Sequence, residues 1–359
     1  MFHAQLYDLL KRQIGDGELS PGQKIPSERS LSDLYGVSRI TAKTAVLRLV
    51  NDGLVVRAAG KGTFVADGLN LGALAATRTG NIGFVRNKRK GERAPLLQDA
   101  VYLSLSQSIE REVVRNGMHI MIATVDEDDV GEMNSYKALV DKVDGLIIAE
   151  PRTSVLMEFA QRRRKPVVLA TPSERRPQFD SVDIDNEQLG YDATRFAVSR
   201  GHTTIAYVQG RQDIAATQDR LAGHLKALGE AGLSDVAGSV FLANGWTMDH
   251  GEAAYRSVSD WNHYTAVICT NDSIALGVIR AASASGRRVP EDLSVIGCDN
   301  IELSERSVPP LTTIDIHIQA IGNVATSRLF ARLDGDDGPV QRILLPFELI
   351  ERESCADLR

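Results

Sequence analysis

Residues 17–65 read GELSPGQKIPSERSLSDLYGVSRITAKTAVLRLVNDGLVVRAAGKGTFV. Ser27 stands before a run with helical spacing, and its hydroxyl is suited to accept from the free amides of a helix over 28–35. A tight turn follows, and Ser38 predicts a second cap, for a helix from 39 to about 51. Two helices joined by a tight turn are typical of a helix-turn-helix, which this stretch therefore predicts.

The sequence on either side of this motif completes a small module. Upstream, an amphipathic pattern over 2–14 predicts a first helix. Downstream, residues 55–57 and 63–65 predict two short strands around a glycine-rich hairpin with a basic tip at 58–62. This order of elements predicts an α+β winged helix-turn-helix. Its core is expected to hold the apolar residues at helical spacing, which are Phe2, Leu6, Leu9, Leu10, Ile14, Leu31 and Leu34.

The same stretch resembles the GntR-type winged helix, because its PSER, GVSR and GKGTFV segments stand in that family's order and spacing. The resemblance implies that the helix opening at Arg39 enters the major groove of operator DNA, while the hairpin tip touches the neighbouring groove or backbone. Carried over by position, the residues expected to contact DNA are Arg29, Ser38, Arg39, Thr41, Lys43, Gly60, Lys61 and Gly62.

Two of these positions carry a physical expectation of their own. Arg39, at a helix N-terminus, has the fork geometry for a bidentate pair with guanine, worth ~1–3 kcal/mol of discrimination. Position 43 is usually arginine in the family, and Lys43 lacks that fork, so we expect a phosphate contact or a looser base preference there. The alternative for Arg29, Arg39 and Lys43 is ordinary solvated surface charge.

The charge distribution supports a basic DNA-binding module at the N-terminus of an otherwise acidic chain. The 359-residue chain has a formal net charge of −6, but residues 1–66 hold nine Lys or Arg against six Asp or Glu. Three widely separated cysteines, an N-terminus without a signal-peptide pattern and the absence of a long apolar run predict a reduced cytoplasmic protein that does not span a membrane.

From residue 80 onwards the pattern changes to short apolar strands that alternate with amphipathic helices. This alternation predicts parallel sheets covered by helices on both faces, and about 280 residues favour two α/β lobes over one. The predicted strands are 82–85, 119–123, 146–148, 167–169, 181–184, 205–208, 266–269 and 293–296. The clearest helices are 103–115, 189–199, 220–230 and 274–285.

Polar side chains gather where these strands end. Asn271 and Asp272 follow one strand, Asp299 follows another, residues 183–186 end a third, and Arg220 is expected to open the helix after a fourth. Because ligands of open α/β sheets bind beyond the carboxyl ends of the strands, these groups are expected to share a cleft. Carboxylates, an amide and a guanidinium suit a ligand with many hydroxyl groups.

This second region is similar to the LacI-type effector domain, itself related to periplasmic sugar-binding proteins. The resemblance rests on segments such as SVDIDNEQLGYDATRFAVSRGHTTIAYV, TQDRLAGHLKALGEAGL and AVICTNDSIALGVIRAASASGRRVPEDLSVIGCDN, and covers nearly all of 80–354. It implies effector contacts by Asp185, Arg220, Asn271 and Asp299, with Asp272 as a candidate behind them. For Asp185 and Asp272 a helix cap is an equal alternative, and Arg220 has the alternative of a surface ion pair.

Two aromatic residues, Tyr102 and Trp246, have two alternatives, stacking on a sugar or ordinary packing. In LacI-type domains the loop that corresponds to residues 87–90 usually supplies a polar contact, but here that loop is unusually basic, which puts the contact in doubt.

No motif of a hydrolase, metalloprotease, P-loop enzyme or dinucleotide-binding enzyme is present, and no cofactor or metal site is predicted. The expected organisation is a head over 1–66, a connection over 67–79 and an effector-binding and dimerising body over 80–359. The pairing of these two modules resembles the arabinose-responsive repressors. We therefore expect a homodimeric repressor released from its operator by a sugar. A purine corepressor is the alternative effector, and a solute-binding protein or an enzyme is the alternative class.

Overall fold

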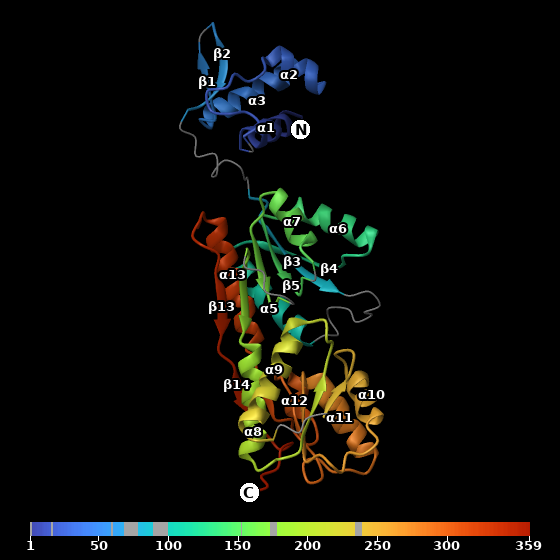
Figure 1. Cartoon of the computed structure of the whole chain (residues 1–359). Coiled ribbons are helices and arrows are strands. Elements are labelled where there is room, and N and C mark those ends of the chain that lie inside the picture. Colours follow the sequence, from blue (N-terminus) through green and yellow to red (C-terminus); the bar gives the residue numbers. More distant parts are fainter. Residues whose placement is uncertain are drawn as a thin grey trace. The chain divides into compact units, whose positions relative to one another are not determined.

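The computed structural model describes residues 2–15, 17–58, 60–67, 78–88, 100–151, 153–172, 178–233 and 239–359. The chain divides into two compact units, Met1–Thr79 and Gly80–Arg359, which are described separately below as the head and the body (Figure 1). Most of the connection expected over 67–79 lies outside the described residues.

The head is a winged helix-turn-helix. Its elements are α1 (Phe2–Gly15), α2 (Glu28–Tyr35), α3 (Arg39–Asn51) and the antiparallel strands β1 (Val55–Ala58) and β2 (Gly62–Val65). Both predicted caps are confirmed. The Ser27 hydroxyl accepts from the Ser30 amide and the Ser38 hydroxyl accepts from the Thr41 amide, each at 3.1 Å.

The core of the head lies between its three helices and the hairpin, and holds Leu6, Leu10, Ile14, Ile25, Leu31, Ala42, Ala45, Val46 and Leu49 among others. The expected burial of Leu34 is wrong, since 68% of its surface is exposed. The short helix α2 packs through the face that carries Leu31, and Leu34 falls outside that face.

The body consists of two α/β lobes. The N-terminal lobe has a wholly parallel six-stranded sheet in the order β13-β7-β6-β5-β3-β4. Its strands are β3 (Asn81–Lys88), β4 (His119–Asp126), β5 (Gly145–Ala149), β6 (Val167–Ala170), β7 (Asp180–Ile184) and β13 (Arg342–Leu345). Its helices are α5 (Ala100–Arg115), α6 (Val130–Val140), α7 (Val155–Arg162) and α13 (Ile318–Leu333).

Successive side chains of these strands point to opposite faces of the sheet and are apolar on both, which explains why helices cover both faces. In β5, Ile147 and Ala149 pack on the side of α5 and α13, whereas Leu146 and Ile148 pack on the side of α6 and α7. Because successive strand residues point to opposite faces, a strand that is apolar throughout must be buried on both.

The C-terminal lobe repeats this architecture with four parallel strands in the order β11-β10-β8-β9. The strands are β8 (Ile205–Gln209), β9 (Val240–Leu242), β10 (Ala266–Cys269) and β11 (Ser294–Ile296). The helices are α8 (Asn186–Ser199), α9 (Ala215–Glu230), α10 (Met248–Ser257), α11 (Asp272–Ala284) and α12 (Glu302–Arg306). The strands β12 (Thr313–Asp315) and β14 (Glu348–Ile350) form a small antiparallel pair.

Along the part of the body that the structure describes, the chain passes between the lobes three times. It leaves the six-stranded sheet after β7, returns between β12 and α13, and leaves again between β13 and β14 (Figure 1). These connections join two separately packed sheets, so they are the natural positions for a hinge between the lobes.

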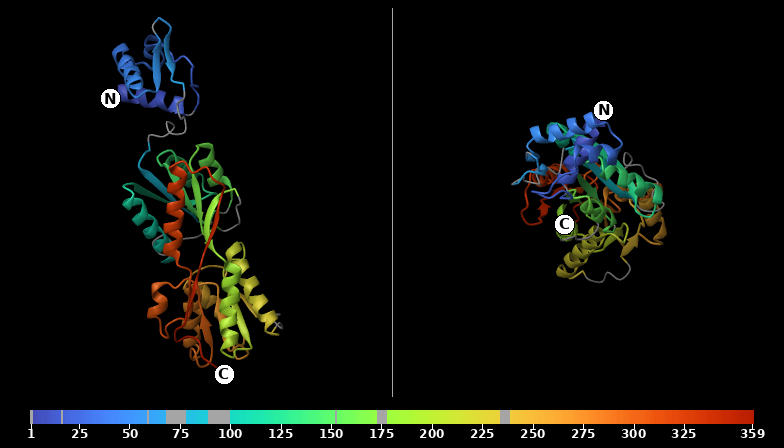
Figure 2. Two further views of the ribbon diagram at one scale, coloured as in Figure 1. Left: turned by 90° about the vertical axis from the view of Figure 1, so that its left-hand side faces the viewer. Right: turned by 90° about the horizontal axis from the view of Figure 1, so that it is seen from above.

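Two glycines bring α8 and α9 into direct backbone contact. A Cβ atom added at Gly190 would lie 1.9 Å from the Arg220 carbonyl oxygen, and one added at Gly223 would lie 1.9 Å from the Glu187 carbonyl oxygen. The two helices therefore lie side by side (Figure 2). Because the Arg220 backbone is one side of this contact, the packing of the two helices also fixes the position of Arg220.

Candidate functional site

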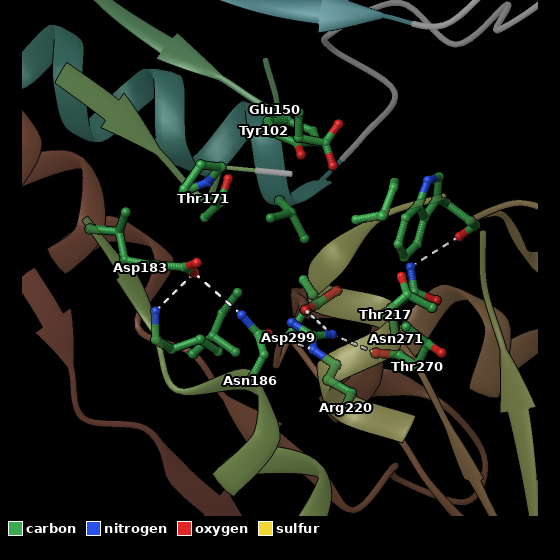
Figure 3. Close-up of a pocket in the computed structure, with 18 of the residues that line it drawn as sticks. Tyr102, Glu150, Thr171, Asp183, Asn186, Thr217, Arg220, Thr270, Asn271 and Asp299 are labelled. Carbon is green, nitrogen blue, oxygen red and sulfur yellow. Dashed lines mark hydrogen bonds and ion pairs between the residues drawn. The ribbon is translucent and has the colours of Figure 1, made fainter. Parts of the chain in front are cut away.

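A pocket with a cavity volume of about 90 Å³ lies between the two lobes of the body. It is built at the carboxyl ends of the parallel strands, as open α/β sheets predict. In Figure 3, Tyr102, Glu150 and Thr171 of the N-terminal lobe lie across from Arg220 and Asn271 of the C-terminal lobe. The described lining also includes Arg86, Asp183, Asn186, Thr217, Trp246, Thr270 and Asp299, with apolar residues such as Val101, Ile214, Ile316 and Ile321.

Three of the pocket residues adopt a backbone conformation that side chains rarely tolerate. The φ angles are 49° at Glu150, 46° at Thr171 and 116° at Asp299, each directly beyond or close to the end of a strand. Non-glycine residues with positive φ cost of order 1–3 kcal/mol and cluster at ligand sites. Their gathering around one pocket makes it the candidate functional site of the body.

Arg220 is held in place by several polar partners. Its Nε donates to the Asn186 side-chain oxygen at 2.9 Å and its Nη1 donates to the Thr270 carbonyl oxygen at 2.6 Å. The same Nη1 lies 3.8 Å from an Asp299 carboxylate oxygen. A buried guanidinium stays charged and is held in a fixed plane, so it presents donors without having to be ordered on binding.

Asn271 is also oriented before any ligand arrives. Its side-chain oxygen caps α11 by accepting from the Ile274 amide at 2.8 Å, and its NH₂ group donates to the Trp246 carbonyl oxygen at 3.1 Å. This second bond ties the loop that carries Trp246 to the start of α11. Both Trp246 and Tyr102 line the pocket, and the Arg86 guanidinium carbon lies 4.4 Å from the centre of the Tyr102 ring.

On the side of the N-terminal lobe, Asp183 supplies a carboxyl group. It accepts from the Ile184 amide at 2.8 Å and, at 3.5 Å, from the Asn186 NH₂ group (Figure 3). Burial raises the pKa of Asp183 to about 6, against the lowering effect of these hydrogen bonds and of Arg220.

The structure places three of the five predicted effector residues on the pocket wall: Arg220, Asn271 and Asp299. Arg220 does not open a helix as expected, because α9 begins at Ala215 and Arg220 lies in its second turn. Asp185 does not line the pocket, and the helix cap given as its alternative is the role observed. Its side chain is exposed and caps α8 by accepting from the Gln188 amide at 3.1 Å, while Asp183 takes the place on the pocket wall.

Asp272 lies behind the pocket wall, where its side chain is fully buried, in keeping with its expected place behind the contact residues. Its carboxylate accepts from the Ile301 amide at 3.0 Å and from the hydroxyls of Ser304 and Thr313. Burial raises the pKa of Asp272, opposed by these hydrogen bonds. Asp272 therefore ties the start of α11 to the loop that carries Asp299.

The pocket contains residues that the sequence did not single out. Arg86 is 1% exposed and lies within β3, two residues before its end, and Glu150 and Thr171 follow the next two strands of the sheet. A charged residue inside the apolar run IGFVRN was the available signal for Arg86. The described part of the basic loop, Asn87 and Lys88, pairs with Glu127 and Glu132 and does not line the pocket.

The second candidate surface belongs to the head. Arg29, Arg39 and Lys43 are exposed on α2 and α3, and Ser38 and Thr41 share a hydrogen bond of 2.8 Å between their hydroxyls. Gly60, Lys61 and Gly62 form the exposed hairpin tip, with φ angles of 72° at Gly60 and 123° at Gly62. These positive angles explain why glycines flank the tip.

Lys24 adds a cation to this tip that no motif in the sequence indicated. It forms a bridge with Phe64, and a Cβ atom added at Gly62 would lie 2.4 Å from the Lys24 Cε atom. The exposed lysine therefore lies against the wing. A second link, the ion pair between Arg57 of β1 and Glu28 of α2 at 2.6 Å, joins the wing to the helices.

Within the described ranges, no helix is both long and apolar enough to cross a bilayer. The same residues contain no group of three or more His, Cys, Asp or Glu side chains arranged to hold a metal ion.

Comparison with known proteins finds a family match in each of the two units. Residues 2–65 match the model of bacterial regulatory proteins of the gntR family, and residues 194–355 match the periplasmic binding protein-like domain. The chain is 31% identical over 292 residues to the HTH-type transcriptional regulator DegA of Bacillus subtilis (strain 168), covering 80% of this chain and 84% of DegA. It is 30% identical over 276 residues to the HTH-type transcriptional repressor PurR of Klebsiella pneumoniae subsp. pneumoniae, covering 75% of this chain and 80% of PurR.

Among solved structures, a complex of the transcriptional regulator CelR with cellobiose superimposes with a TM-score of 0.70 at 25% identity, covering 92% of this chain and all of CelR. The relatives are transcription regulators rather than enzymes. The chain belongs to the family of HTH-type transcriptional regulators with a LacI-type, periplasmic-binding-protein-like body, and it carries a GntR-type winged helix as its DNA-binding head.

Proposed function

We propose that the protein is a homodimeric repressor that leaves its operator when an uncharged sugar fills the pocket of the body. The observation that carries this proposal is the preformed set of Arg220, Asn271 and Asp299 on one wall of the pocket. A guanidinium and an amide donate hydrogen bonds, and a carboxylate accepts them. Neighbouring hydroxyl groups of a sugar need this mixture in fixed positions.

The charges of the pocket favour an uncharged effector. Among the described residues that line it, two arginines, Arg86 and Arg220, stand with three carboxyl groups, those of Glu150, Asp183 and Asp299. Cations do not outnumber carboxyls, so a phosphate or carboxylate on the ligand would gain little and would meet like charges at short range. Sugar phosphates are therefore expected to bind less well than free sugars.

A purine corepressor is the second candidate, because PurR proteins are among the relatives. A flat base gains most of its affinity from stacking on aromatic faces. In this pocket the Arg86 guanidinium carbon lies 4.4 Å from the centre of the Tyr102 ring, so the cation covers one aromatic face. This leaves less flat surface for a base and favours a sugar, with arabinose as the first candidate from the pairing of head and body.

Control of DNA binding follows from linkage between the two sites. A ligand that bridges both walls of the pocket stabilises the closed arrangement of the lobes, and the three connections between the lobes are the positions at which they hinge. In a homodimer such closure changes the preferred separation of the two heads, and with it the match to operator half-sites.

The proposal is tested by measuring the melting temperature of the full-length protein with pentoses, hexoses, disaccharides, sugar phosphates and purine bases. A ligand at 100 times its Kd stabilises the folded state by ≈ 2.7 kcal/mol, which raises the melting temperature measurably. We expect a free sugar to give the largest rise. A rise with hypoxanthine or guanine and none with any sugar would overturn the sugar proposal in favour of the purine candidate.

A further inference from the structure

Ile40 presents an apolar side chain at the start of α3. It is the second residue of the helix, and 79% of its surface is exposed. The face of α3 that packs on the rest of the head is formed by Ala42, Ala45, Val46 and Leu49. Ile40 therefore contributes nothing to the core, and its exposure has no explanation in the packing of the head.

The surroundings of Ile40 are those of a surface that meets a polyanion. Arg39 and Lys43 flank it, both are exposed, and neither forms an ion pair with any residue that the structure describes. The hydroxyls nearby are already engaged, since Thr41 is bonded to Ser38 and Thr44 donates to the Ile40 carbonyl oxygen at 2.8 Å. Along the start of α3, the side chains free to reach outward are two cations with an isoleucine between them.

DNA offers one apolar group in the major groove, the 5-methyl group of thymine. We propose that Ile40 reads a thymine through this methyl group and so determines part of the operator sequence. The inference rests on the proposed entry of α3 into the major groove. A protein partner is the less favoured occupant, because Arg39 and Lys43 would have to be buried against it, whereas phosphates and base edges neutralise both.

The test uses the full-length protein and its operator, selected from a pool of random duplexes without added ligand. Each thymine of the selected half-site is replaced in turn by deoxyuridine, which removes the methyl group and keeps the base pair. We expect one replacement to weaken binding by the wild type by about three- to five-fold, as for one buried methyl group. Ile40→Ala is expected to bind thymine and deoxyuridine duplexes equally at that position.

Two variants make the result specific to Ile40. Ile40→Val keeps a branched apolar side chain and is expected to retain most of the preference for thymine. Leu47→Ala removes another exposed apolar side chain of α3, two turns further on, and is expected to show the full wild-type preference. Because Ile40 lies outside the core, its variants are expected to melt at the wild-type temperature.

The inference is overturned if no deoxyuridine replacement weakens wild-type binding, or if Ile40→Ala still distinguishes the two bases at the sensitive position. Failure to select any sequence would instead contradict the DNA-binding role of α3, and the inference with it. Methyl sensitivity without any response of DNA binding to effectors would support the inference and contradict only the proposed control by a sugar.

Discussion

Arg220 and Asp299 lie with Nη1 and a carboxylate oxygen 3.8 Å apart, although one belongs to α9 and the other to the loop after β11. The arginine is held by Asn186 and Thr270, and the aspartate by a backbone with φ of 116°. The pair is therefore prepared as a neighbouring donor and acceptor, which is the arrangement that two adjacent hydroxyl groups of one ligand can use together.

Arg220→Lys is expected to weaken effector binding by about 10- to 100-fold, because a lysine cannot replace the fork that reaches two partners and a ligand at once. Isothermal calorimetry with the effector found in the melting screen measures this loss. Arg211→Lys is the matched control, since Arg211 pairs with Asp213 at the surface and does not line the pocket. Equal affinities for Arg220→Lys and the wild type would remove Arg220 from the site.

Asp183 gives the body a specific pH dependence. Its pKa is raised from 3.8 to about 6 by burial, so the folded state favours the protonated form. The stabilisation from this group is fully present below its unfolded pKa and is lost as the pH rises through about 6, a contribution on the order of 2–3 kcal/mol.

Asp183→Asn keeps the shape of the protonated carboxyl group and cannot titrate. As the pH rises from 4 to 7, the free energy of unfolding of the variant is expected to increase by about 2 kcal/mol relative to that of the wild type. Urea unfolding of both proteins across this range measures the difference. A difference that does not change with pH would show that Asp183 keeps its ordinary pKa.

The crossing of α8 and α9 predicts opposite effects for two glycines of one helix. Gly223→Ala places a Cβ atom 1.9 Å from the Glu187 carbonyl oxygen, so the helices must separate, at a cost of about 2–3 kcal/mol in unfolding free energy. Gly229→Ala meets nothing within 4 Å and is expected to stabilise the helix by up to about 1 kcal/mol. Thermal unfolding compares them, and similar stabilities for the two variants would contradict the close crossing.

Arg39 and Lys43 are expected to differ in what they contribute to DNA binding. Arg39→Ala is expected to relax the base preference at one operator position, by ~1–3 kcal/mol of lost discrimination. Lys43→Ala is expected to weaken binding to all sequences alike and to lower the slope of log affinity against log salt by about one unit. Binding to the operator and to single-base variants at several salt concentrations separates the two effects. An unchanged base preference in Arg39→Ala would remove it as a base-reading residue.

Much of the fold could be predicted from the sequence, because strongly patterned segments carry their own signal. All eight predicted strands of the body lie within one residue of the observed ones or inside them. The strands β9, β12, β13 and β14 were not predicted. Each has only three or four residues, and all but β12 are partly exposed along their whole length, so neither alternation nor a buried apolar run marks them.

The site was predictable at the strand ends and less so elsewhere. Asp183 and Asp185 stand two residues apart in one segment, and only the observed end of β7 shows that the first lines the pocket while the second caps α8. Arg86, Glu150 and Thr171 come together only through the sheet order β6-β5-β3. Because β3 and β5 are neighbours in the sheet although β4 lies between them in the chain, spacing in the sequence does not reveal that Arg86 lies near the other two.

Under the proposed function, occupancy of the pocket controls DNA binding by the head. This control is tested most directly by measuring the affinity of the full-length protein for its selected operator with and without the effector at saturation. We expect the effector to weaken operator binding at least tenfold and, by linkage, the operator to weaken effector binding by the same factor. Equal operator affinities with and without bound effector would contradict it.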